Sequence, residues 1–255
     1  MSSERVSDGF WQPDWPVPVN VGVLLTDRSG GGSAAPYDGL NLALHVGDDA
    51  QTVAANRERL QTRLGTVNVQ WLEQVHGTKV ATAAADGVVR TADAAVTRDT
   101  NLACAVMTAD CLPVLLCDQG GTVVAAAHAG WRGLVDGVIA NTVASMAVPA
   151  TQITAFLGPA ISQAHFEVGI EVVEAVFALA TTDAEVQAIA KAVTPGARAL
   201  HFYLDLYAVA RVQLAGLGIT SVYGGEHCTY GDARFFSYRR QKVTGRQASL
   251  IWLQA

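Results

Sequence analysis

Three short apolar runs in the middle of the chain, over 102–107, 113–117 and 122–127, most constrain how it can fold. Each run is rich in Val, Leu or Ala and is bounded by Gly, Asp or Pro. Short hydrophobic runs without polar alternation are typical of strands that are buried on both faces. The sequence therefore predicts a central sheet that is covered on both sides.

Further segments predict an α/β arrangement around these strands. Residues 21–26, 67–72, 153–157, 235–238 and 248–253 are expected as strands. Apolar residues at helical spacing predict a helix capped by Asp48 or Asp49, and others over 133–146, 170–179, 184–193 and 204–214. The Pro- and Trp-rich residues 1–18 are expected as a surface arm. Since no repeat or linker follows, we expect one α/β domain over 19–255, with mixed β-sheet layers flanked by helices.

Composition excludes several classes of protein. A chain of 255 residues with 50% hydrophobic and 16% charged residues can bury a large core and is not disordered. A net charge of -6 argues against binding a nucleic-acid polymer. The uncharged stretch between Asp136 and Glu167 is interrupted by Asn, Pro and Gln, so no membrane span is expected. Without a visible secretory signal, we expect a reduced, cytoplasmic protein that is a monomer or a small homo-oligomer.

Three residues that can bind metals or perform catalysis stand at the ends of apolar runs: His76, Cys111 and His128. Strand ends are where α/β enzymes place their sites, so these side chains are expected to converge from separate elements. Two imidazoles and a thiolate form a ligand set that suits zinc. Three protein ligands leave a fourth position for water or substrate, as in catalytic zinc sites.

Two other interpretations use the same residues. Cys111 can act as a nucleophile with His128 as its base, while Asp110 or another carboxylate orients the imidazole. Alternatively, Cys111 and each His are ordinary buried groups, which is how we interpret Cys104 and Cys117 inside predicted strands. Both catalytic uses require a thiolate, so the sequence pattern leaves the choice between them open.

Arginine and glycine residues supply candidate anion ligands. The loop 30–33 could present backbone N–H groups to phosphate, with Arg28 at its edge, although a flexible turn is the alternative. Arg132 follows His128 closely enough to line the same cleft, or it forms a surface ion pair. Arg239 and Arg240 end an aromatic run and could hold a base and an anion, or lie on a solvated strand edge.

Taken together, these segments resemble the bacterial YfiH-like laccase-domain family, whose members were first described as polyphenol oxidases and are now regarded as purine nucleoside phosphorylases. The matching stretches run from about residue 20 to the C-terminus, over 28–33, 40–42, 45–48, 74–77, 108–113, 128–133, 158–161 and 236–240. One departure is Gly32, where a Val is expected in the family's glycine loop.

The resemblance implies a single α/β domain with one zinc ion held by His76, Cys111 and His128. It also implies phosphorolysis of adenosine, inosine, guanosine and related nucleosides such as methylthioadenosine to base and ribose 1-phosphate, with deamination of adenosine as a second activity. The expected partners are purine nucleosides and inorganic phosphate. The candidate substrate residues are Arg28, Gly31, Ser33, Asn41, Arg132, Tyr238 and Arg239. Candidates for protonating the leaving base are His45, Asp93 and Tyr238.

Two alternative functions accompany this resemblance. One is peptidoglycan editing by a hydrolase that acts through Cys111. The other is polyphenol oxidation by copper. A multicopper centre needs on the order of ten His ligands, several of them in H-x-H pairs. The chain has six His and no such pair, which excludes that centre within one chain. A single Cu²⁺ at the His and Cys site remains an alternative cofactor, because copper outcompetes zinc at N/S sites.

Overall fold

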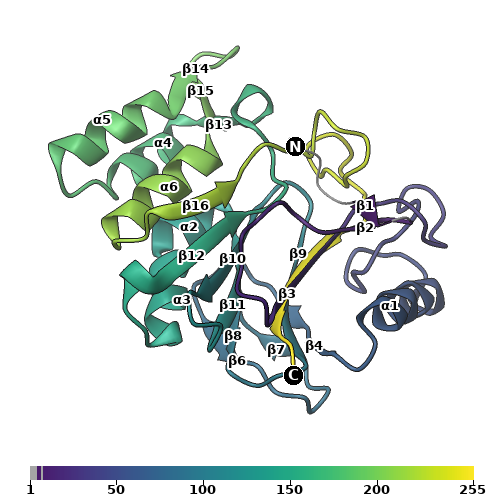
Figure 1. Ribbon diagram of the computed structural model, residues 1–255. Coiled ribbons are helices and arrows are strands. Elements are labelled where there is room, and N and C mark those ends of the chain that lie inside the picture. The colour runs from purple at the N-terminus through teal and green to yellow at the C-terminus, as the bar shows by residue number, and fades with distance from the viewer. Residues whose placement is uncertain (1–4, 7) are drawn as a thin grey trace.

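The computed structural model describes residues 5–6 and 8–255, and two six-stranded sheets packed face to face form its centre (Figure 1). The first sheet has, in spatial order, the strands β1 (Arg5–Val6), β2 (Phe10–Trp11), β3 (Val21–Thr26), β17 (Gln247–Leu253), β9 (Leu102–Thr108) and β4 (Asn68–Gln70). The second has β16 (Ser221–Gly224), β12 (Ile153–Leu157), β10 (Leu112–Asp118), β11 (Val124–Ala129), β8 (Ala94–Thr97) and β6 (Val80–Thr82). Most neighbouring strands are antiparallel, and β4–β9, β6–β8 and β12–β16 are the parallel pairs of these two sheets.

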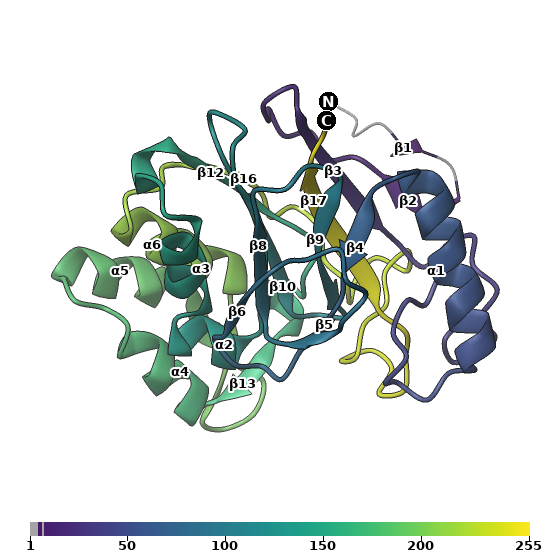
Figure 2. The same ribbon diagram turned by 90° about the horizontal axis from the view of Figure 1, so that it is seen from below.

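Helices cover the outer faces of both sheets (Figure 2). Helix α1 (Ala50–Leu64) packs on the first sheet. The second sheet is covered by α2 (Trp131–Asp136), α3 (Val138–Met146), α4 (Ile170–Phe177), α5 (Asp183–Lys191) and α6 (Leu206–Gly216). The remaining short elements are β13 (Glu167–Gly169), β14 (Val193–Pro195), β15 (His201–Leu204), the pair β5 (Leu72–Glu73) and β7 (Arg90–Thr91), and the 3₁₀ turns η1 (Ala150–Gln152) and η2 (Gln163–His165).

Alternate residues of the central strands enter different cores, because successive side chains of a strand point to opposite faces. On β9, Cys104 and Val106 pack between the two sheets, while Ala103 and Ala105 pack toward α1. On β10, Cys117 packs between the sheets. The prediction of an α/β fold whose central strands are buried on both faces is confirmed, as is the core position of both cysteines.

Two predicted elements differ in the structure. The helix expected over 133–146 is divided at Gly137, whose φ of 96° lies in the left-handed region that ends a helix. The segment 235–238 is a loop and not a strand. Phe235 and Phe236 are fully buried there. The Phe236 N–H donates to Gln247 Oε1 at 2.8 Å, so a side chain, and not a neighbouring strand, satisfies this backbone donor.

Residues 8–18, expected as part of a surface arm, pack against the sheets, and residues 1–4 and 7 of that arm lie outside the described residues. Strand β2 pairs with β3, and Trp11 and Trp15 are buried. Trp15 Nε1 also donates to Thr154 Oγ1 of β12 at 3.1 Å. Asp49 caps α1 as expected, since its carboxylate accepts from the Thr52 N–H at 2.8 Å. Within the described residues, no helix combines the length and the apolar character that crossing a membrane requires.

Candidate functional site

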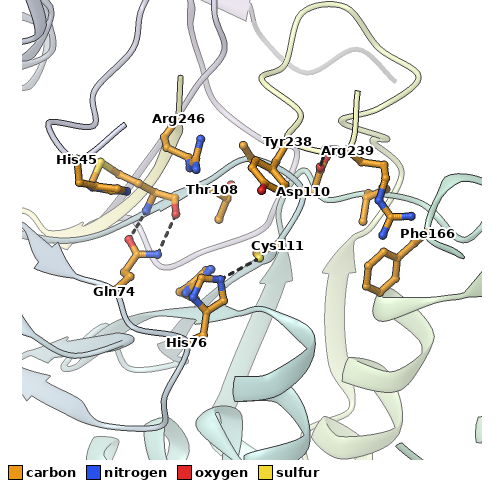
Figure 3. Close-up of a pocket in the computed structure, with 14 residues that line it drawn as sticks. His45, Gln74, His76, Thr108, Asp110, Cys111, Phe166, Tyr238, Arg239 and Arg246 are labelled. Atoms are coloured by element: carbon orange, nitrogen blue, oxygen red, sulfur yellow. Dashed lines mark hydrogen bonds between the residues drawn. The ribbon is translucent and has the colours of Figure 1, made fainter. Parts of the chain in front are cut away.

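The structure brings His76, Cys111 and His128 together from three separate segments. His76 lies in the loop between β5 and β6, Cys111 in the turn before β10, and His128 on β11. Their ligand atoms all lie within 4.8 Å of one another, and His76 Nε2 is 3.9 Å from Cys111 Sγ (Figure 3). His128 is buried, Cys111 is half-buried and His76 is exposed. The cluster is therefore anchored on one side and open on the other.

Asp93, at the entry to β8, holds two of the three ligands in place. Its fully buried carboxylate accepts from the backbone N–H groups of Val75, His76 and Gly77 at 3.2, 2.9 and 2.7 Å. Asp93 Oδ1 also lies 2.9 Å from His128 Nδ1. This contact leaves Nε2 of His128 to face the cluster. A carboxylate behind a histidine ligand is a common support of metal sites, because it fixes the ring and raises its basicity.

Charges within the cluster favour the thiolate of Cys111. Burial alone raises the pKa of this thiol, but His128 and His76 outweigh that effect and lower the pKa to about 6. Burial lowers the pKa of His128, yet Cys111 and Asp93 outweigh it and the net shift is upward. A thiolate with two imidazoles is a donor set that binds zinc or copper. The residues present therefore fit a metal ion.

Gly130 allows the ligands to approach one another. A Cβ atom at this position would lie 3.0 Å from Cys111 Sγ and 3.1 Å from His76 Cδ2. Both contacts are tighter than nine in ten real Cβ contacts, so with a larger residue Cys111 or His76 must shift by a few tenths of an ångström. Glycine at 130 therefore lets these two side chains keep their spacing.

We expect Gly130→Ala to weaken metal binding by about tenfold or more, because the added methyl group moves Cys111 or His76 out of position. Competition with a chromophoric chelator measures this affinity. Gly32→Ala is the matched control, since a Cβ atom at Gly32 has Thr52 Cγ2 at 3.7 Å as its nearest neighbour. Equal affinities in the two variants would contradict the steric argument.

The cluster forms part of the wall of a cavity of about 390 Å³ (Figure 3). This volume lies in the range of about 300–1,000 Å³ that is typical of small-molecule sites. The cavity is lined by His45, Gln74, His76, Met107, Thr108, Ala109, Asp110, Cys111, His128, Ile161, Phe166, Tyr238, Arg239 and Arg246. A small polar or aromatic ligand can therefore reach the cluster and two guanidinium groups together.

Tyr238 and Arg239, two of the predicted substrate residues, line this cavity. The Arg239 backbone N–H donates to Asp110 Oδ2 at 2.6 Å, and its guanidinium lies 5.3 Å from the Phe166 ring centre. Asp110 has a φ of 94° and also accepts from Thr229 Oγ1 at 2.6 Å. Asp110 therefore positions the Arg239 segment. Of the two alternatives left open by the sequence, Asp110 or another carboxylate, it is the second that lies beside His128, because Asp93 contacts its ring.

The glycine loop does not contribute to the cavity. Arg28, expected to bind phosphate there, is paired instead with Asp38 at 2.6 Å. Gly31 permits close backbone packing, since a Cβ atom would lie 2.2 Å from the Gly39 carbonyl oxygen. Arg28 and Gly31 are therefore held by neighbours within the loop region and do not line this cavity, and their role in binding substrate stays a prediction.

Ser33, Asn41 and Arg132 are also absent from the cavity wall. Ser33 Oγ and Asn41 Nδ2 both donate to Asp48 Oδ2, at 2.7 and 2.9 Å. Arg132 is exposed at the start of α2, and its guanidinium lies 4.4 Å from the Trp131 ring centre. Ser33 and Asn41 thus stabilise a turn through Asp48, and Arg132 faces solvent, so their role in binding substrate stays a prediction.

The structure adds residues that the sequence reasoning missed. Arg246 reaches the cavity from the segment before β17. Its only signal in the sequence was its place as a charged residue just before an apolar run. Gln74 is fixed by Met107, whose N–H and C=O each lie 2.8 Å from its side-chain amide. Among the candidate proton donors, His45 and Tyr238 line the cavity, whereas Asp93 is buried behind the cluster.

A family model described as "Multi-copper polyphenol oxidoreductase laccase" matches residues 22–254. The chain belongs to this family. Curated relatives are named differently from the family model. "Purine nucleoside phosphorylase PA4543" of Pseudomonas aeruginosa is 50% identical over 243 residues, covering 95% of this chain and 97% of the relative. "Purine nucleoside phosphorylase YfiH" of Escherichia coli is 46% identical over 245 residues, covering 94% of this chain and 97% of the relative.

Solved structures show the same laccase-domain fold. Neisseria meningitidis protein NMB0706 has a TM-score of 0.90 and 50% identity, and the match covers 97% of this chain and all of that one (100%). YlmD from Geobacillus stearothermophilus has a TM-score of 0.89 and 27% identity, with 99% of each chain covered. The predicted membership in the YfiH-like laccase-domain family and the predicted fold class are confirmed.

Proposed function

We propose that this protein is a zinc-dependent purine nucleoside phosphorylase that converts adenosine, inosine, guanosine and related nucleosides to base and ribose 1-phosphate. One observation carries the proposal: a single cavity of nucleoside size is lined both by the cluster of His76, Cys111 and His128 and by two arginines. The names of relatives that are 43–50% identical support it. The catalytic unit is residues 19–255.

Two imidazoles and a thiolate fit zinc, the metal that we assign to His76, Cys111 and His128. A zinc ion bound there supplies Lewis acidity that polarises a ligand oxygen. Cu²⁺ is the competing ion at such a donor set. All four cysteines of the chain are free, which fits a reducing compartment and supports a cytoplasmic location.

Phosphorolysis requires positive charge near the entering phosphate. Arg239 and Arg246 line the cavity, and both can donate forked hydrogen bonds to phosphate oxygens. Desolvation by burial lowers the pKa of Arg246, but a guanidinium remains charged at neutral pH. In the reaction, a phosphate oxygen forms a bond to ribose C1′ while the bond from C1′ to the purine breaks. The two arginines balance phosphate charge as the ribose becomes cationic.

The purine base needs an apolar or aromatic contact and a proton when it leaves. Phe166 and Tyr238 supply aromatic rings on one side of the cavity (Figure 3). Burial, together with the charges of Arg246 and Arg57, lowers the pKa of His45. His45 is therefore neutral at pH 7, and one ring N–H can donate a hydrogen bond to the base. Tyr238 Oη is the second donor that lines the cavity.

A second candidate uses Cys111 as a covalent nucleophile in a hydrolase, such as a peptidoglycan-editing enzyme. The line from Asp93 through His128 to Cys111 favours it, because a carboxylate orients the base beside the thiol. However, a nucleophile needs one imidazole, and His76 brings a second to within 3.9 Å of the sulfur. The extra imidazole makes metal binding the better use of this arrangement.

We expect the purified protein to release hypoxanthine from inosine only when inorganic phosphate is present, with ribose 1-phosphate as the second product. Liquid chromatography of reactions with and without phosphate measures both products. Adenosine in the same assay tests deamination as a second activity, through the appearance of inosine. Hypoxanthine release that does not depend on phosphate would contradict phosphorolysis, and no release would favour the hydrolase.

A further inference from the structure

A second thiol cluster lies outside the cavity wall described above. Cys228 lies in the loop after β16, where its backbone forms an isolated parallel β-bridge with Ala160. This bridge brings Cys228 close to η2. Its Sγ accepts from Ser162 Oγ at 3.0 Å and lies 3.4 Å from His165 Nδ1. Ser162 Oγ is also 3.3 Å from His165 Nδ1. A thiol, a hydroxyl and an imidazole are thus in mutual contact.

Backbone donors complete the surroundings of this sulfur. The N–H groups of Ser162 and Gly231 point to Cys228 Sγ from 3.5 and 3.3 Å. The His165 ring is held against Tyr230, with ring centres 4.4 Å apart and planes inclined by 25°. Donors that converge on one atom stabilise negative charge there. Burial raises the pKa of Cys228, but these hydrogen bonds outweigh it and lower the pKa overall.

The other cysteines have different surroundings. Cys104 and Cys117 are fully buried in β9 and β10, and burial raises the pKa of both thiols. Cys111 belongs to the metal cluster. Cys228 is half-buried, so a small reactant can reach its sulfur. Reactive cysteines combine a stabilised thiolate with access from solvent, and Cys228 has both properties without belonging to the metal cluster.

We propose that Cys228, with Ser162 and His165, is a reactive thiolate site that hydroperoxides oxidise to a sulfenic acid. The thiolate sulfur attacks one oxygen of hydrogen peroxide, so an S–O bond forms and the O–O bond breaks. The sulfur loses two electrons, and the peroxide gains them. The departing hydroxide takes a proton from solvent and leaves as water, while the cysteine retains the other oxygen as S–OH.

The test is trapping of sulfenic acid with dimedone in the intact, metal-loaded protein at pH 7, followed by peptide mass spectrometry. We expect Cys228 to be modified at least about tenfold faster than Cys104 or Cys117, which serve as internal controls. We also expect its rate in the folded protein to be at least about tenfold higher than its rate in the urea-unfolded chain. Iodoacetamide labelling under the same conditions gives a second measure of thiolate reactivity. A rate at Cys228 equal to that of the unfolded chain would overturn the proposal.

Two variants test the role of the neighbours. Ser162→Ala and His165→Asn should each slow modification of Cys228 by about tenfold, because the first removes a hydrogen-bond donor to the sulfur and the second removes the imidazole 3.4 Å from it. Ser145→Ala at an exposed position and His201→Asn at a half-buried position are the matched controls and should leave the rate unchanged. Continued protection of Cys104 and Cys117 verifies that each variant is folded. Unchanged rates in both test variants would show that this cluster does not activate the thiol.

Discussion

Replacing Cys111 by Ser is expected to abolish stoichiometric zinc binding and phosphate-dependent cleavage of inosine together. A serine hydroxyl stays protonated at neutral pH and is a much poorer zinc ligand than the thiolate, whose pKa His128 and His76 lower to about 6 against the effect of burial. We expect zinc affinity to fall by at least about 100-fold. This exceeds the fall of roughly 10- to 100-fold that is typical when a residue supporting a metal ligand is removed.

The measurement is metal analysis of protein purified without added metal, alongside the inosine assay. Cys117→Ser is the matched control, because it removes a buried thiol near the C-terminal end of β10, whereas Cys111 lies in the turn before the strand begins. Zinc retention with full phosphorolysis in Cys111→Ser would make the zinc assignment wrong. Retention of zinc with loss of turnover would instead favour Cys111 as a nucleophile. Copper in the wild-type protein would replace zinc as the bound ion.

The central layers could be predicted because their physical cause is local in sequence. Uninterrupted apolar runs such as those of β9 and β10 have no polar face to turn to water, so they must be covered on both sides. The cluster of His76, Cys111 and His128 could be predicted for a related reason: these residues are polar groups at the ends of such runs. The loop at 235–238 was missed because a side chain satisfies its backbone: the Phe236 N–H donates to Gln247 Oε1 of β17, 11 residues further along the chain.

The residues that line the cavity were harder to predict, because a side chain's partners in the fold decide whether it is free to face a ligand. Arg28 and Asn41 have the chemistry of ligand-binding groups, but Asp38 and Asp48 bind them within the folded chain. Arg246 lies far from the cluster in sequence and reaches the cavity only through the pairing of β17 with β9. Such long-range pairings leave no local pattern in the sequence. Composition and spacing therefore could not separate residues that line the cavity, such as Arg246, from residues that are bound within the fold, such as Arg28 and Asn41.

Asp93 had a signal of a different kind. It is a lone carboxylate between apolar residues at 92 and 94–96, and a charge in such a run is stable in a core only when partners satisfy it. In the structure these partners are the N–H groups of the His76 loop and Nδ1 of His128. A buried acid in an apolar run therefore indicated a supporting residue, and not the proton donor for which it was considered.

Asp93→Asn is expected to lower zinc affinity by about 10- to 100-fold, although Asp93 lies behind the ligands. An amide has one acceptor oxygen in place of two, and its NH₂ group would face N–H donors of the loop 75–77 or the ring of His128. The His76 loop then loses its anchor, and the ring of His128 loses the partner that directs Nε2 to the cluster. Chelator competition measures the affinity.

Asp118→Asn separates this effect from a general loss of stability. Asp118 is also a buried carboxylate, and it accepts from the N–H groups of Thr122 and Val123 at 2.7 and 2.9 Å. Both substitutions should cost about 1–3 kcal/mol in the free energy of unfolding, because each leaves buried donors without an acceptor. Only Asp93→Asn should weaken zinc binding. If both variants bound zinc as tightly as the wild-type protein, other contacts would be holding His76 and His128 in place.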